Sequence, residues 1–148
     1  MDADLNKRYQ TCLSLWFVMM MNIGIFLVIS IFAVPTATEM ETTPARLFTI
    51  AIAAAATFMV IISFAVKRKV LERSVETQDV TLVQKGLILA CAMCEVSAVL
   101  GLVERIALRN NDHYVLFAIA LIGTALHFPR REQLEAATYK SKGINQAN

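Results

Sequence analysis

Apolar residues in this chain are gathered into four blocks that are separated by short polar segments. The first three blocks cover residues 13–34, 47–66 and 86–103, and Glu95 is the one charged residue within them. The fourth block, 114–128, is shorter than the roughly 17–25 residues that usually cross the hydrocarbon of a bilayer. Flanking polar side chains and local thinning of the bilayer extend the reach of such a segment. The pattern therefore predicts four membrane spans.

The expected fold follows from the lipid environment that these apolar blocks predict. Backbone polar groups in hydrocarbon must be hydrogen-bonded within the chain, so each block is expected to be a helix. Short links make successive helices antiparallel. We therefore expect an all-α fold: an integral membrane antiparallel four-helix bundle, formed by residues 1–140 as a single domain. Residues 130–140 are expected to form a short helix at the membrane interface, and residues 141–148 a disordered tail.

Small residues indicate where the helices should touch, because they let two backbones approach closely in a membrane. One stripe of small residues recurs at helical spacing in the third block, and an alanine-rich run lies in the second. We expect both to be helix contacts; their members are Ala90, Cys94, Ser97 and Gly101, and Ala51 with residues 53–56.

The basic residues predict the orientation of the bundle. With four spans, the N-terminal segment, the middle loop and the C-terminal segment lie on one side of the membrane. That side holds 11 of the 14 lysines and arginines: Lys7, Arg8, Lys67, Arg68, Lys69, Arg73, Lys85, Arg130, Arg131, Lys140 and Lys142. By the positive-inside rule, both termini are expected inside, in a membrane of the bacterial plasma-membrane type. The first block exceeds the 7–15 apolar residues of a typical signal peptide, so we expect it to be retained.

Composition narrows the classes of function. Apolar residues make up 57% of the chain and charged residues 18%, with a net charge of +2 and three cysteines. These values do not fit a disordered chain, a disulfide-framed secreted module or a nucleic-acid binder. We find no catalytic constellation, no metal-ligand set and no glycine-rich phosphate loop. We therefore expect no enzyme and no cofactor; the expected partners are the lipid bilayer and a second copy or other membrane subunits.

One acid lies at the centre of the third block. A charged group at the middle of a bilayer costs roughly 2.5–3.5 kcal/mol on insertion scales. We therefore expect Glu95 to face protein, to be protonated, or to hold a cation. Asn22, Thr57 and Thr124 lie at similar depth in the other blocks. If they face inward, the four residues form a mid-depth cluster, which is either a proton or sodium site or a hydrogen-bonded contact between helices.

The sequence around Glu95 has a family resemblance. The pattern Glu-x-x-Ala-Val-x-Gly-Leu-Val is made by Glu95, Ala98, Val99, Gly101, Leu102 and Val103. It resembles the carboxylate-bearing helix of subunit c of rotary ATP synthases. The resemblance implies that Glu95 carries a translocated proton or sodium ion. Leu100 stands where that family usually has an aromatic residue, and the loop 67–81 lacks its Arg-Gln-Pro motif, so a straightforward rotor subunit is not expected.

A second motif is the Cys-x-x-Cys of Cys91 and Cys94. A four-helix membrane protein with this motif resembles the vitamin K epoxide reductases and the DsbB-like oxidoreductases, which implies thiol redox chemistry. Here the pair lies near mid-membrane, no outer loop contains cysteine, and Cys12 is expected to lie far away. Apolar surroundings also disfavour the thiolate. Small-residue packing is thus the favoured interpretation.

Three hypotheses about function follow. The first is a structural or accessory subunit of a membrane assembly with a protonatable carboxyl at Glu95. The second is proton or sodium translocation through Glu95 with Asn22, Thr57 and Thr124. The third is a membrane thiol oxidoreductase. His127, at the inner end of the fourth block, is expected to reach the membrane interface rather than to form a site.

Overall fold

The chain is helical throughout the residues that the computed structural model describes, which are 2–32, 43–108 and 111–144. Within these ranges there are five α-helices and one 3-10 turn: α1 (Asp2–Phe32), α2 (Thr43–Thr77), α3 (Val80–Leu108), η1 (Asn111–His113), α4 (Tyr114–Leu126) and α5 (Arg131–Ile144). No strand occurs in this part of the chain. The all-α prediction is confirmed.

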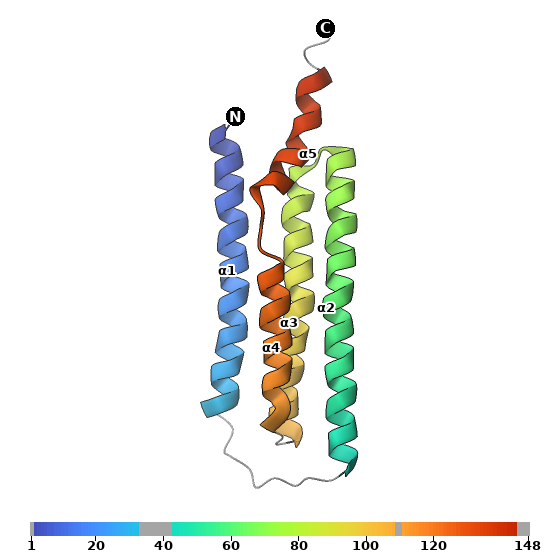
Figure 1. Ribbon diagram of the computed structural model, residues 1–148. Helices are drawn as coiled ribbons and strands as arrows, with labels where there is room; N and C mark the ends of the chain where they lie inside the picture. The colour runs from blue at the N-terminus through green and yellow to red at the C-terminus, as the bar shows by residue number, and fades with distance from the viewer. Residues whose placement is uncertain (1, 33–42, 109–110, 145–148) are drawn as a thin grey trace.

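The first four helices run side by side with alternating direction, and α5 lies beyond the end of α4 (Figure 1). The start of α1 and all of α5 are at the same end of the bundle. Helix α3 is the central element, because it contacts α1, α2, α4 and α5. In its most apolar stretch 44% of the residues are buried, against 11% in α1 and in α2. Two of the long helices therefore leave most of their apolar surface uncovered.

Three of the helices, α1 to α3, are long and apolar enough to cross a membrane, and α4 is a shorter apolar helix. All three continue beyond the apolar blocks of the sequence into charged segments, because Lys, Arg, Glu and Leu are good helix formers. Helix α2 reaches Thr77, and the turn to α3 uses Gln78 at a positive φ of 56°. Asp79 then caps α3 by accepting hydrogen bonds from the amide and hydroxyl of Thr81, which lower the pKa of the Asp79 carboxyl.

Helix α5 is docked on the same end of the bundle by a small apolar cluster. Its Leu134 and Ala137 pack with Val83 of α3, against Leu5 and Tyr9 of α1. This confirms the short helix expected over residues 130–140. The disordered tail expected over 141–148 is wrong for its first four residues, because α5 continues to Ile144. Good helix formers such as Glu135, Ala136 and Ala137 precede this last turn, while residues 145–148 lie outside the described part of the chain.

The distribution of side chains is the reverse of that in a water-soluble bundle. Large apolar side chains cover the outside of α1 to α4, among them Phe17, Val18, Ile25, Phe48, Phe58, Ile61, Leu89, Val99, Val115 and Ile122. The buried positions are instead mostly small or polar: Ala56, Ala90, Ala98, Ala120, Ser30, Ser63, Ser97 and Thr124. Such an exterior is compatible with an integral membrane protein.

The small residues of α3 form the contact that the sequence predicts. Ala90, Cys94 and Ser97 are fully buried, and a Cβ atom on Gly101 would lie 3.1 Å from the Cβ atom of Leu116 in α4. The expectation for the alanine-rich run of α2 is wrong for most of its members, since only Ala56 is buried. Residues 51–56 cover more than one full turn of the helix and point in every direction, so only one or two of them can face a neighbouring helix.

Candidate functional site

The carboxyl of Glu95 lies at the junction between α3 and α1. One hydrogen bond reaches it: the side-chain amide of Asn22 donates to Oε2 over 3.2 Å. Glu95 is only partly buried, and its neighbours Val96 and Val99 on α3 are 40% and 42% exposed. The carboxyl is thus covered by the chain on one side and adjoins an apolar outer surface on the other.

The structure brings Asn22 to Glu95 but does not add the two threonines to the pair. Thr57 is exposed on α2, and its hydroxyl donates to the carbonyl of Ala53 over 2.8 Å. It follows Ala56, which occupies the buried face, so Thr57 does not meet the condition of facing inward that the mid-depth cluster requires. A similar depth fixes the height of a residue on its helix but not the face on which it lies. Thr124 is fully buried, and its carbonyl accepts a hydrogen bond from Trp16 Nε1 over 2.8 Å.

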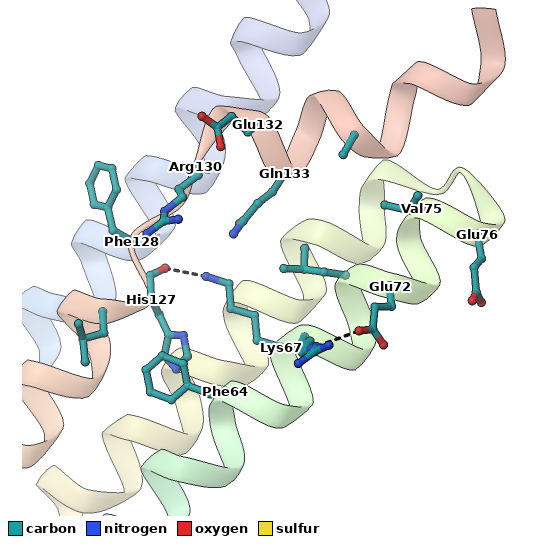
Figure 2. Close-up of a pocket in the computed structure, with 14 residues that line it drawn as sticks. Phe64, Lys67, Glu72, Val75, Glu76, His127, Phe128, Arg130, Glu132 and Gln133 are labelled. Atoms are coloured by element: carbon teal, nitrogen blue, oxygen red, sulfur yellow. Dashed lines mark hydrogen bonds and ion pairs between the residues drawn. The ribbon is translucent and has the colours of Figure 1, made fainter. Parts of the chain in front are cut away.

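A second polar cluster forms where α4 ends. We call it the inner polar cluster and define it as Ser63, Lys67, Cys94 and His127. The hydroxyl of Ser63 is 2.7 Å from Nε2 of His127 and 3.7 Å from the sulfur of Cys94. Lys67 Nζ donates to the carbonyl oxygen of His127 over 3.1 Å, as Figure 2 shows. All four residues are buried.

The end of α4 explains why these polar groups are buried. Pro129 has no amide hydrogen and therefore cannot continue a helix. The amides of His127 and Phe128 still bond to the last carbonyls of α4, but the carbonyl of His127 is released from the helical pattern. A buried backbone carbonyl needs a hydrogen-bond partner. The ammonium of Lys67 supplies that partner.

The protons in this cluster can be assigned from the hydrogen bonds. Ser63 has a single hydroxyl proton, and it is donated to the carbonyl of Val60. The bond between Ser63 and His127 must then run from Nε2–H to the hydroxyl oxygen. His127 Nδ1 is left as a buried acceptor with no partner among the described residues. A nucleophilic serine gives its proton to the histidine, so this arrangement is structural rather than that of a catalytic dyad.

The side chain of His127 does not reach outward, as the expected interface position requires. Its side chain is fully buried, and its ring lies 4.3 Å from the ring of Phe64, measured between centroids. Because the chain leaves the helix after Leu126, the imidazole turns toward α2 and contacts the hydroxyl of Ser63.

The three cysteines are all buried and free. Cys12 packs with Cys91 and Leu87 in one cluster, so the expected separation of Cys12 from the Cys-x-x-Cys motif is wrong. The reason is that α1 packs directly against α3, which brings distant parts of the sequence together. Cys94 is in a tight contact between α3 and α4, because a Cβ on Gly123 would approach its sulfur to 2.9 Å. These contacts are those of small packing residues.

Sequence reasoning did not find the inner polar cluster. A signal was present, because Ser63 and Lys67 are spaced by four in α2 and therefore share one face of the helix. Pro129 added the information that a carbonyl is released nearby. Within the described ranges, no three His, Cys, Asp or Glu side chains are grouped in a way that would hold a metal ion.

Comparisons with known proteins provide no relative to this chain. No protein-family model matches the sequence, and no curated protein or solved structure matches it. The class that the structure defines is an all-helical protein with three long apolar helices, compatible with membrane insertion. Any statement about its activity therefore rests on the Glu95 site and on the inner polar cluster.

Proposed function

We propose that this chain is an integral membrane protein that acts as a structural or accessory subunit of a membrane assembly. The observation that carries the proposal is the partial cover of Glu95. A carboxyl at mid-depth in a bilayer is costly unless it is protonated and hydrogen-bonded. Oε2 of Glu95 accepts one hydrogen bond from Asn22, and the carboxyl, which is only partly buried, keeps hydrogen-bonding capacity for a further partner.

The surface around Glu95 suits a protein neighbour. Val96 and Val99 on α3 are exposed, as are Val18 and Ile25 on α1. Lipid tails offer no hydrogen bonds to a carboxyl, whereas a helix from a second copy or from another subunit can offer them. Contact with such a helix would satisfy Glu95 and cover part of the apolar surface at the same time.

The location follows the charge distribution. We place the four apolar segments across a membrane of the bacterial plasma-membrane type, with both termini inside. The shared end of α1 and α5 in Figure 1 and the basic residues near it support this orientation. Helix α4 remains the shortest of the four spans in this arrangement.

Ion translocation is the second candidate. It is favoured by the partly exposed position of Glu95, from which a proton or sodium ion can be exchanged with an adjoining subunit. The resemblance of this helix to subunit c supports the same candidate. The positions of Thr57 and Thr124 favour the accessory function instead, because neither threonine is hydrogen-bonded to Glu95. Thiol redox chemistry is favoured least, since the cysteines serve as packing residues.

Two substitutions of Glu95 separate the first two candidates. Glu95→Gln keeps hydrogen bonding but abolishes proton exchange, whereas Glu95→Leu removes both. Assembly is measured by cross-linking of Val99→Cys in native membranes, with Ile61→Cys, on the exposed face of α2, as the matched control. We expect cross-linking at Val99→Cys that persists with Glu95→Gln and falls at least about tenfold with Glu95→Leu, which corresponds to roughly 1.4 kcal/mol of contact energy.

Carbodiimide labelling of Glu95 adds an independent measurement. The carboxyl should be labelled in protomers dissociated by detergent and protected in native membranes, with Glu95→Gln as the control for the labelled position. Equal cross-linking in Glu95→Leu and in the parent protein would contradict the assembly proposal. Loss of proton or sodium flux in vesicles by Glu95→Gln, with assembly intact, would establish translocation in its place.

A further inference from the structure

A cavity of about 720 Å³ opens between α2, the end of α4 and the start of α5. Its volume lies within the roughly 300–1,000 Å³ of small-molecule sites. The inner polar cluster forms one wall through Lys67 and His127, and the first turn of α5 forms another. The cavity is not part of the Glu95 site, which lies at the junction of α1 and α3.

The part of the cavity nearest the middle of the bundle is apolar. It is lined by Phe64, Leu126 and Phe128, which are 40%, 64% and 44% exposed. Helix α4, with 13 residues, is about 20 Å long, whereas the hydrocarbon of a bilayer is about 30 Å thick. In the proposed membrane orientation, the apolar part therefore lies at the depth of the inner-leaflet acyl chains.

The other part of the cavity presents cationic and amide groups. The side chains of Lys67, Arg130 and Gln133 point toward the same space in Figure 2. Lys67 is 92% buried, and its ammonium uses one donor for the carbonyl of His127. Among the described residues, no carboxylate lies within ion-pair distance of Lys67 or Arg130.

The acids that line the cavity do not neutralise these two cations. Glu72 is paired with Arg68 over 2.9 Å, and Glu132 points away from Arg130 in Figure 2. Glu76 lies nine residues along α2 from Lys67, which is about 13 Å at the helical rise. The unpaired positive charge is therefore concentrated beside the apolar part of the cavity.

We propose that this cavity binds one anionic glycerophospholipid of the inner leaflet. Lys67 and Arg130 bind the phosphate, Gln133 donates a hydrogen bond to it, and the acyl chains pass Phe64 and Phe128 into the bilayer. Basic pockets between helices on the cytoplasmic side of membrane proteins bind such headgroups. The inference rests on the proposed membrane insertion but not on the role of Glu95.

Trp16 provides a reporter for this site. It is the only tryptophan of the chain, and its ring meets that of Phe128 edge-on, with centroids 5.1 Å apart. Protein in phosphatidylcholine nanodiscs is titrated with phosphatidylglycerol that carries brominated acyl chains, which quench tryptophan fluorescence on contact. Brominated phosphatidylcholine with the same chains is the control lipid. We expect half-maximal quenching at a mole fraction at least about fivefold lower for phosphatidylglycerol.

The cations are tested by substitutions that preserve length. Arg130→Gln and Lys67→Gln are each expected to weaken the phosphatidylglycerol response about fivefold, the effect of one basic residue at a membrane surface. Arg131→Gln is the matched control, because Arg131 adjoins Arg130 but is paired with Glu135 over 3.0 Å outside the cavity. Arg130 is exposed, so its substitution preserves the fold and keeps the test decisive if Lys67→Gln does not fold.

Three results would overturn the lipid site. Equal quenching by the two brominated lipids would mean that the headgroup is not selected. An equal loss of the response with Arg131→Gln and with Arg130→Gln would mean that the basic surface is diffuse. Displacement of the lipid by soluble glycerol phosphate at equal concentration would mean that the site binds a soluble anion. Failure of membrane insertion itself is recognised separately, because neither brominated lipid would then quench Trp16.

Discussion

The inner polar cluster and the Glu95 pair are both polar sites in an apolar bundle, but the chain satisfies them to different degrees. Ser63, Lys67 and His127 are buried and bonded to one another or to a backbone carbonyl. Glu95 is partly exposed and has a single bond from Asn22. The hydrogen bonds of the first site join α2 to α4 within the chain. The partly exposed carboxyl of Glu95 is the group for which we propose contact with a second molecule.

The difference also concerns what holds each site in place. The inner polar cluster lies in the tight contact of α2, α3 and α4, where Gly123 approaches Val60 and Cys94. The Glu95 pair joins only α1 and α3, and α1 exposes most of its apolar surface. Substitutions in the inner polar cluster should therefore lower the free energy of unfolding, and substitutions in the Glu95 pair should chiefly change association with another subunit.

The largest effect on stability is expected from Gly123→Val. A Cβ at this position would lie 2.9 Å from the sulfur of Cys94 and 3.0 Å from Val60 Cγ1, so a valine forces α4 away from α2 and α3. Overpacking of this kind costs roughly 1–3 kcal/mol or more. Unfolding in sodium dodecyl sulfate mixed micelles, followed by Trp16 fluorescence, measures the loss. Gly24→Val is the matched control, since nothing lies within 4 Å of its Cβ; equal losses for the two variants would contradict the tight contact.

Ser63→Ala should have the next largest effect. It removes the acceptor of His127 Nε2–H and leaves a second ring nitrogen of a fully buried histidine without a partner. An unsatisfied buried donor costs roughly 1–3 kcal/mol. The same unfolding measurement applies, with Ser14→Ala on the exposed face of α1 as the control. A loss no larger than that of the control would show that the imidazole finds another acceptor.

The sequence predicts the elements well because long apolar blocks leave the backbone few choices. A helix satisfies the backbone polar groups of such a block internally, Pro129 follows the end of α4, and the small residues Ala90, Cys94 and Ser97 mark the contact face of α3. Helices α1 to α3 outlast their apolar blocks, since hydropathy marks the part that suits lipid and not the ends of the helix. Helix α5 packs through Leu134 and Ala137 against α1 and α3, and so adds a further helix outside the apolar blocks.

The candidate sites are harder to predict, because depth along a helix is readable from the sequence but the direction of a side chain is not. Asn22 and Thr57 were placed at the same depth, yet only Asn22 faces Glu95. In a soluble helix, apolar periodicity identifies the inward face. In the apolar blocks within α1 and α2 nearly every position is apolar, so that signal is lost there. The burial of His127 is also not predictable from the sequence, because it depends on the path of the chain after α4, which only the packed structure defines.

The smallest effect on stability is expected from Asn22→Leu, which also gives the sharpest test of the comparison. Its hydrogen bond with Glu95 is partly exposed, and interhelical hydrogen bonds in membranes average about 0.6 kcal/mol. Thr57→Val is the control at the same depth, and it should leave the unfolding free energy unchanged because Thr57 bonds within its own helix. If Asn22→Leu costs as much as Ser63→Ala, the Glu95 pair is a structural site like the inner polar cluster. If Asn22→Leu lowers the unfolding free energy only slightly and cross-linking at Val99→Cys is retained, the result supports the proposal that Glu95 itself contacts a neighbouring subunit.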